Sequence, residues 1–219
     1  MAKELRVDEI RGALEHMILA GDMQPGQRLN ELALASRFKS SRGVVRQAVR
    51  ALEQARLVEV VANRGAVVRQ LDLSRALELF EIRAGLARTA GRLATLRAMR
   101  SQIGVLESLH KAMAKAASAG DLAEFQSLNL QFHAAMFEAA ANERLRDIDL
   151  IIRNEMQLYI RQNVGSEAQM RVSLAEHEAI LAALISGDSE SCAGAFERHI
   201  LNGKQRAIDA GSTTLGRSA

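Results

Sequence analysis

The sequence predicts a mainly α-helical protein built from two parts, an N-terminal winged helix-turn-helix and a C-terminal all-α antiparallel bundle of helices. The first observation is that 219 residues contain 1 proline and are dominated by alanine, leucine, glutamate and arginine, which favours long uninterrupted helices. The second is that β-branched residues replace the helical periodicity between residues 57 and 68, directly after two short helical segments.

The first part is expected to span residues 1–70 and to begin with a helix that ends near Gly21, because apolar residues recur there at helical spacing. After a break at Pro25-Gly26, a second helix is expected over Glu31–Phe38. Asn30 directly precedes this helix and is of the residue type that caps helix N-termini. The sequence therefore predicts two helices before residue 39.

A third helix and a hairpin complete the first part. Ser40 or Ser41 is expected to cap the third helix, since both lie in a short polar turn before its apolar face begins. Short strands are predicted over residues 57–61 and 66–68, joined by a turn at residues 62–65 that contains asparagine and glycine. A helix followed by such a hairpin predicts a winged helix-turn-helix.

Arginines gather on this third predicted helix. Arg42, Arg46 and Arg50 lie four residues apart and share one face, with Gln47 on a neighbouring face. A guanidinium can bind a guanine edge or a phosphate by two hydrogen bonds, and an α-helix fits the major groove. Arg64 at the hairpin tip is expected to reach the minor groove or a phosphate. A charged row is often only the solvated face of a helix, but the arginine-tipped hairpin favours DNA binding.

The segment resembles the DNA-binding domain of GntR-family bacterial transcription regulators. The matching residues are Pro25-Gly26, Leu29, Glu31, Leu34-Ala35, Ser41-Arg42, Val45-Arg46, Ala48, Leu52, Leu57 and Gly65. The resemblance implies that Arg42, Arg46 and the wing tip at Arg64-Gly65 contact DNA. Two positions depart from the family pattern, because Arg56 stands where a glycine is frequent and Leu32 stands where some members have a DNA-contacting arginine. The candidate DNA-contacting residues are Ser41, Arg42, Arg46, Gln47, Arg50, Arg64 and Gly65.

The second part is expected to span residues 71–210, with a short linker at residues 69–73 joining it to the first part and a flexible tail at residues 211–219. Helices are predicted over residues 73–98, 102–118, 121–140, 143–163, 167–186 and 189–209. Asp121, Ser166 and Asp188 are expected to cap three of them. Short loops between consecutive helices predict an antiparallel bundle.

Three histidines and an asparagine are the candidate metal ligands. Asn129 and His133 lie four residues apart and share a face of one predicted helix, whereas His177 and His199 lie on two others. If these helices surround one cavity, three imidazoles and an amide oxygen converge, a set that suits zinc, nickel, copper or iron. The alternative is that they are ordinary core or surface histidines, and no metal-binding sequence motif supports the cluster. Glu176 and Glu178 flank His177 but are expected to diverge.

This region resembles the FCD domain, the helical effector domain of the FadR subgroup of the same family. The matching residues are Asn129 with Phe132-His133, Asn142, Leu145, His177 with Ile180 and Ala183-Leu184, Gly187-Asp188 and His199. The resemblance implies a divalent metal that helps to hold a small carboxylate effector. Asn129 replaces the family aspartate, so we expect weaker metal binding or a different ligand. Arg83 is either an effector-binding residue or part of a salt bridge within the bundle.

The sequence thus predicts a transcription regulator that binds a pseudo-palindromic double-stranded DNA operator as a homodimer and responds to a small organic acid with a zinc or nickel ion. A metal-dependent enzyme acting on a small carboxylate, or a regulator with a metal-free pocket, are the alternatives. No serine–histidine–acid set or phosphate-binding loop is evident, which argues against an enzyme. Cys192 is the only cysteine, and no long apolar run exists, so a cytoplasmic protein without membrane contact is expected.

Overall fold

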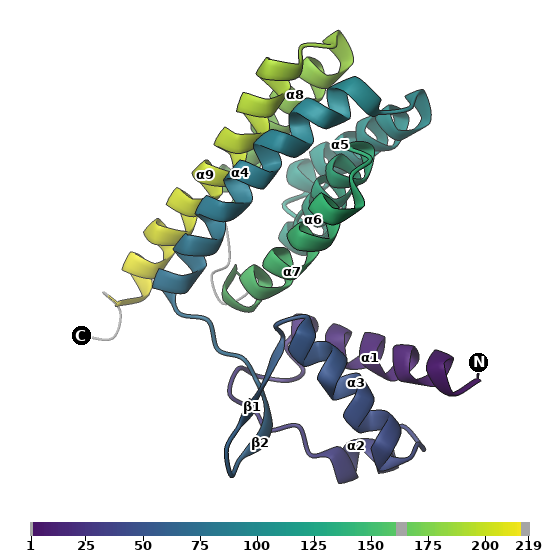
Figure 1. The fold of residues 1–219 in the computed structure, drawn as a ribbon. Coiled ribbons are helices and arrows are strands. Elements are labelled where there is room, and N and C mark those ends of the chain that lie inside the picture. Colours follow the sequence, from purple (N-terminus) through teal and green to yellow (C-terminus); the bar gives the residue numbers. More distant parts are fainter. Residues whose placement is uncertain (1, 161–165, 216–219) are drawn as a thin grey trace. The chain divides into compact units, whose positions relative to one another are not determined.

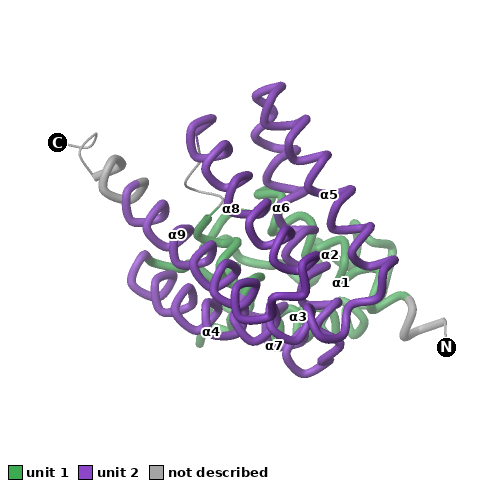
Figure 2. Tube along the Cα trace, turned by 90° about the horizontal axis from the view of Figure 1, so that it is seen from above, with its two compact units in different colours: residues 1–72, 153–162 green, residues 73–152, 163–219 purple. Residues whose placement is uncertain are grey.

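The computed structural model describes residues 2–160 and 166–215. The chain forms two compact units, shown in different colours in Figure 2. The first contains Met1–Asp72 and Arg153–Gln162, and the second contains Leu73–Ile152 and Asn163–Ala219. Helix α7, Glu143–Ile160, therefore contributes residues to both units.

The first unit is a winged helix-turn-helix, as predicted (Figure 1). Its elements are α1 (Ala2–Ala20), α2 (Glu31–Arg37), α3 (Arg42–Gln54), β1 (Val58–Val61) and β2 (Gly65–Val68). The apolar faces of its helices pack around one core, which is formed by Ile10, Leu14, Ile18, Leu34, Val45, Val49 and Leu52. This core fixes which face of α3 is left for solvent.

Side-chain caps fix the starts of α2 and α3. Asn30 Oδ1 accepts hydrogen bonds from the backbone N–H groups of Leu32 and Ala33 at 3.0 and 3.1 Å. Ser41 Oγ accepts from Val44 N–H at 3.3 Å, so Ser41 rather than Ser40 caps α3. Each cap satisfies donors that have no partner inside the helix.

The wing is an antiparallel pair in which Val58 faces Val68 and Val61 faces Gly65. Gly65 has a φ of 75°, in the left-handed region where a glycine is favoured. The sequence did not predict that residues 26–29 lie along β2, where Leu29 N–H donates to Ala66 O at 2.8 Å. This third backbone segment ties the turn before α2 to the wing.

The end of α7 packs within the first unit, which the sequence did not predict. Arg69 Nη1 donates to Glu155 Oε2 at 2.8 Å, and both side chains are largely buried. Asn154 Nδ2 donates to Glu15 Oε1 at 3.3 Å. Arg69, expected to begin a linker, is therefore held by a residue far along the chain.

The second unit is an all-helical antiparallel bundle, as predicted (Figure 1). It contains α4 (Leu73–Arg97), α5 (Arg100–Ala119), α6 (Leu122–Ala139), the start of α7, α8 (Glu167–Ser186) and α9 (Ser189–Leu215). The side chains of Asp121, Ser166 and Asp188 accept hydrogen bonds from the first turns of α6, α8 and α9, which confirms the three predicted caps. Among the described residues, none of the helices has the length and apolarity needed to cross a membrane.

Among the described residues, two helix ends differ from the predicted bounds by two residues or more. Helix α5 starts at Arg100 rather than at residue 102, because Gln102 Oε1 accepts a hydrogen bond from Met99 N–H and closes the first turn. Helix α9 continues to Leu215 instead of ending at Asp209, so the part of the predicted tail that the structure describes is helical. No proline interrupts this stretch. Helix α7 is described to Ile160, and the rest of its predicted span lies outside the described residues.

Helices α4 and α9 pack against each other along their lengths (Figure 1). The two backbones lie close together at Gly91, where an added Cβ would lie 2.9 Å from the carbonyl oxygen of Cys192 and 3.0 Å from Ala193 Cα. Glycine at this position lets two backbones approach closely. The two helices thereby form one wall of the bundle that carries the histidines.

Candidate functional site

One face of α3 presents polar side chains while the other is buried. Arg42, Arg46, Gln47 and Arg50 are exposed, together with Ser41 at the cap. The opposite face contributes Val44, Val45, Ala48, Val49 and Leu52 to the core. The predicted arginine row therefore lies on the accessible side of a helix that is anchored from behind.

Arg46 also pairs with the preceding helix. Its Nε and Nη2 both donate to Glu31 Oε2 at 3.1 Å, and its side chain remains 53% exposed. An exposed pair of this kind contributes little to stability, so the guanidinium can exchange its carboxylate partner for a phosphate or a base. No local sequence pattern predicts this partner for Glu31, because the pairing depends on how α2 and α3 cross.

The wing tip adds further cations. Arg64 and Gly65 are exposed at the turn between β1 and β2. Arg28 is also exposed, and its guanidinium would lie 3.8 Å from a Cβ added to Gly65. No sequence pattern singles out Arg28, since only the pairing of residues 26–29 with β2 brings it beside the wing.

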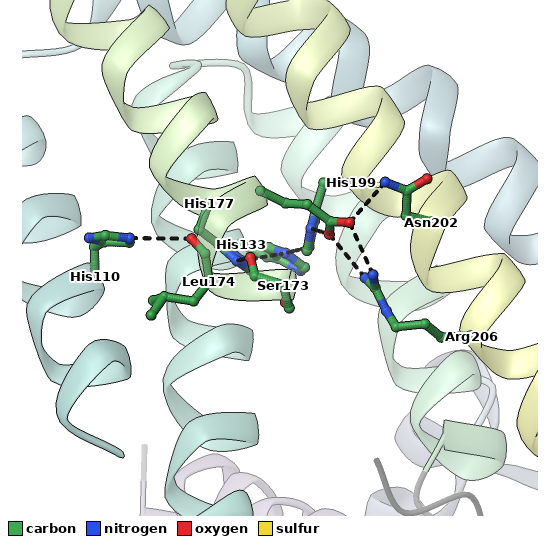
Figure 3. A network of polar contacts seen from close by, with 9 residues as sticks. His110, His133, Ser173, Leu174, His177, His199, Asn202 and Arg206 are labelled. Carbon is green, nitrogen blue, oxygen red and sulfur yellow. Dashed lines mark hydrogen bonds and ion pairs between the residues drawn. The ribbon is translucent and has the colours of Figure 1, made fainter. Parts of the chain in front are cut away.

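The three predicted histidines meet inside the helical unit, one each from α6, α8 and α9 (Figure 3). His133 Nε2 lies 2.8 Å from His199 Nε2 and 3.3 Å from His177 Nε2. All three residues are buried, with exposures of 4% or less. The Nε2 atoms therefore point toward one common position.

Hydrogen bonds at the other ring nitrogens set the tautomers of His177 and His199. His177 Nδ1 lies 2.6 Å from the carbonyl oxygen of Ser173, and His199 Nδ1 lies 2.7 Å from Glu176 Oε2. Both oxygens only accept, so each Nδ1 carries the proton and each Nε2 keeps a lone pair. Burial lowers the pKa of both imidazoles, which keeps them neutral and able to bind a metal.

Glu176 connects the cluster to α9. Its carboxylate accepts hydrogen bonds from His199, from Asn202 at 2.8 Å and from Arg206 at 3.1 Å. Burial by itself raises the pKa of Glu176, but these hydrogen bonds and the Arg206 charge outweigh it and lower the pKa from 4.5 to about 2. The prediction that Glu176 and Glu178 diverge is compatible with this, because Glu178 is exposed.

A buried ion pair lies beside the cluster. Arg83 on α4 donates from Nε to Asp149 Oδ1 on α7 at 2.8 Å, and both side chains are at most 5% exposed. Arg83 Nη2 lies 3.4 Å from His133 Nδ1. Of the two predicted roles of Arg83, the salt bridge within the bundle is the one observed. Because Arg83 also lies close to His133, a role of Arg83 in binding a ligand remains a proposal.

The donor set fits a divalent metal. The three imidazole ligand atoms lie within 4.8 Å of one another. Asn129 precedes His133 by one turn on α6, and its Oδ1 is buried and accepts no hydrogen bond from the described residues. A buried carbonyl oxygen without a donor is unfavourable, and a cation would satisfy it. His133, His177 and His199, with Asn129 as a fourth donor, are the residues that would hold the ion.

A winged helix-turn-helix joined to a separate helical unit is an architecture typical of DNA-binding proteins, in which the helix before the wing lies in the major groove. Residues 6–68 match the model of the family described as bacterial regulatory proteins, gntR family. Residues 78–202, more than half of the chain, match the FCD domain. The chain belongs to the gntR family of bacterial regulatory proteins, in its FCD-containing subgroup, and is a transcriptional regulator with an effector-binding C-terminal domain.

Relatives and solved structures agree with this assignment. The Nta operon transcriptional regulator of Aminobacter aminovorans is 33% identical over 131 residues, covering 59% of this chain and 61% of that protein. The Uxu operon transcriptional regulator of Escherichia coli is 27% identical, covering 92% of this chain and 86% of that protein. The E. coli McbR/YncC structure has a TM-score of 0.79 at 21% identity, covering 93% of this chain and 97% of that chain. At this identity the structural likeness shows the fold alone.

Proposed function

We propose that this regulator reads its operator with α3 and the wing. Helix α3 would enter the major groove with Arg42, Arg46, Gln47 and Arg50, while Ser41 at its N-terminus contacts a phosphate. Arg64 and Gly65 at the wing tip would contact the adjacent backbone or minor groove. The observation that carries this proposal is the exposed arginine row on a helix whose opposite face is buried.

The experiment is a titration of operator DNA, selected from random duplexes on the wild-type protein, with Arg42→Ala and Arg46→Ala variants. Each substitution is expected to weaken binding by about 1–3 kcal/mol, which is roughly 5- to 150-fold, if the guanidinium contacts a base edge. Arg171→Ala, at an exposed arginine of α8, is the matched control and should bind like wild type. Unchanged affinity in both α3 variants would exclude α3 as the recognition helix.

We further propose that the regulator acts as a homodimer on a pseudo-palindromic operator, since a two-fold protein matches two half-sites. Helix α4 offers a surface for this contact. Ile82 and Leu96 are 55% and 68% exposed, and Leu86 and Leu93 lie between them on the same helix face. Glu78 and Glu81 lie beside the Ile82 end and Arg92 and Arg97 beside the Leu96 end, so an antiparallel second copy of α4 would bring opposite charges together.

The helical unit is proposed to bind a small organic acid together with zinc or nickel. Support comes from the three converging imidazoles, the buried Asn129 oxygen and the nearby Arg83 guanidinium, which suits a carboxylate. When bound, the metal would supply a positive charge and open coordination positions for the acid. A metal-free pocket is the second candidate, because His133 and His199 lie 2.8 Å apart and can hydrogen-bond each other directly.

Effector binding is proposed to change operator affinity rather than to start a reaction, in keeping with a family of regulators. The acid must bind the DNA-competent and DNA-incompetent arrangements with different affinity, or the equilibrium does not shift. We place this activity in the cytoplasm, where the operator DNA lies.

A further inference from the structure

We propose that the helical unit has a second ligand site, a cavity that binds an apolar α-amino acid as its zwitterion. The cavity has a volume of about 420 Å³ and lies where α4 and α6 end and where α5 and α7 begin. The described residues that line it do not include His133, His177 or His199. The proposal therefore concerns a site separate from the proposed metal site and does not depend on it.

The buried part of the cavity lining is apolar and closely packed. Phe137 lines the cavity with a side chain that is 1% exposed, and its ring lies against the ring of Phe196 with centroids 5.8 Å apart. Met99 and Ala141 add further apolar surface, and Met99 is 62% exposed. The volume falls in the range of roughly 300–1,000 Å³ that is typical of sites for small organic molecules.

Two of the charged side chains in the lining neutralise each other. Arg146 Nη1 donates a hydrogen bond to Glu138 Oε2 at 3.3 Å, and both residues line the cavity. Arg146 Nη2 donates to Asp147 Oδ1 at 3.3 Å as well. The Arg146–Glu138 pair therefore contributes little net charge to the cavity.

One guanidinium and one carboxylate of the lining stay available for a ligand. Arg97 Nη1 donates to the carbonyl oxygens of Ala140 and Ala141 at 3.2 and 3.3 Å, which orients the guanidinium. Within the described part of the chain, Arg97 Nε and Nη2 have no acceptor and the Glu143 carboxylate has no partner. Gln102 Nε2 is a further donor, since Gln102 Oε1 already accepts a backbone N–H at 2.9 Å.

These available groups define the class of ligand. A simple carboxylate would bind the Arg97 guanidinium but would be repelled by the Glu143 carboxylate, and a simple amine would meet the reverse problem. A zwitterion satisfies both groups, because its carboxylate suits Arg97 and its ammonium suits Glu143. An apolar side chain on the same molecule would cover Phe137 and Met99. An apolar α-amino acid combines these three features.

The test is isothermal titration calorimetry of the full-length protein with L-leucine and with three analogues that each lack one feature. The analogues are 4-methylpentanoate without the ammonium group, 3-methylbutylamine without the carboxylate, and glycine without the apolar side chain. Each analogue is expected to bind at least about fivefold more weakly than L-leucine, because each loses one favourable contact with the cavity.

The deciding variant is Glu143→Gln, which keeps the shape of an exposed side chain and removes its charge. It should bind L-leucine about fivefold more weakly, and its preference for L-leucine over 4-methylpentanoate should disappear. Arg97→Gln should instead lose the preference for L-leucine over 3-methylbutylamine. Arg144→Gln, at the exposed neighbour of Glu143 outside the cavity lining, is the control and should bind like wild type. Circular dichroism confirms that each variant is folded.

The outcomes bear on this site alone. Absence of binding of L-leucine, L-methionine and L-phenylalanine to wild type at millimolar concentration overturns the proposal. Binding of L-leucine that is unchanged in both Glu143→Gln and Arg97→Gln also overturns it, because the amino acid would then bind elsewhere. None of these substitutions lies in α3, in the wing or among the histidines, so either result leaves the proposed DNA and metal sites standing.

Discussion

At the scale of single residues, Glu176 shows how one carboxylate can organise a buried site. It receives hydrogen bonds from His199, Asn202 and Arg206, all on α9, and thereby fixes the ring of His199. The same contacts hold its pKa at about 2, below the ordinary value of 4.5. A carboxylate whose pKa is lowered on folding stabilises the native state above its unfolded pKa, and this contribution disappears as the pH falls toward its folded pKa.

We therefore expect Glu176→Gln to lower the free energy of unfolding at neutral pH by about 1–2 kcal/mol relative to wild type, after allowance for solvent screening. The difference should persist down to about pH 4.5 and then shrink as the pH falls toward 2. Urea unfolding at a series of pH values, with a chelator to exclude metal, measures it. Glu178→Gln, at an exposed neighbour on α8, is the control, and its free energy of unfolding should equal that of wild type. If the difference in unfolding free energy between wild type and Glu176→Gln grew as the pH fell, this account would be wrong.

Some residue-scale features depend only on neighbours along the chain and could be predicted, whereas others depend on residues far away in the sequence. The capping roles of Asn30, Asp121 and Ser166 were predictable, because each cap acts within three residues of itself. The pairing of Arg83 with Asp149 was not, since the two residues lie 66 positions apart and meet only when α4 packs beside α7. For the same reason, the position of Arg28 beside the wing could not be predicted.

At the scale of elements, helical periodicity located every helix of the bundle that the structure describes. The three histidines were predicted to converge, although spacing along one chain could not place three helices around one position, and the family resemblance supplied that arrangement. The attachment of the end of α7 to the first unit had no signal in the sequence. The close packing of α4 and α9 at Gly91 could not be predicted either, because a single glycine adds nothing to the apolar pattern of a helix.

Gly91→Ala is expected to destabilise the protein by about 1–3 kcal/mol, because the new Cβ would meet backbone atoms that cannot rotate away. Gly104→Ala on α5 is the matched control, since an added Cβ there meets nothing within 4 Å. That variant should be up to about 1 kcal/mol more stable, because alanine favours a helix over glycine. Equal denaturation midpoints for Gly91→Ala and wild type would show that α4 and α9 can separate at little cost.

At the scale of the whole molecule, the proposed dimer depends on the exposed apolar face of α4. Ile82→Glu and Leu96→Glu place charges in that face and are expected to shift the protein toward monomers and to weaken operator binding, because a monomer reads one half-site. Light scattering after size exclusion measures the mass. Val105→Glu on α5, at a residue that is 53% exposed, is the control and should remain dimeric. Dimers of unchanged stability in both α4 variants would place the contact elsewhere.

Helix α7 has Asp149 bonded to Arg83 beside the histidines and Glu155 bonded to Arg69 beneath the wing. The stretch between these two acids is a continuous α-helix, roughly 9 Å long at 1.5 Å per residue, and a helix resists bending and stretching over that distance. An anion that displaced Asp149 from Arg83 would therefore act on a helix whose later residues, from Arg153 on, belong to the first unit.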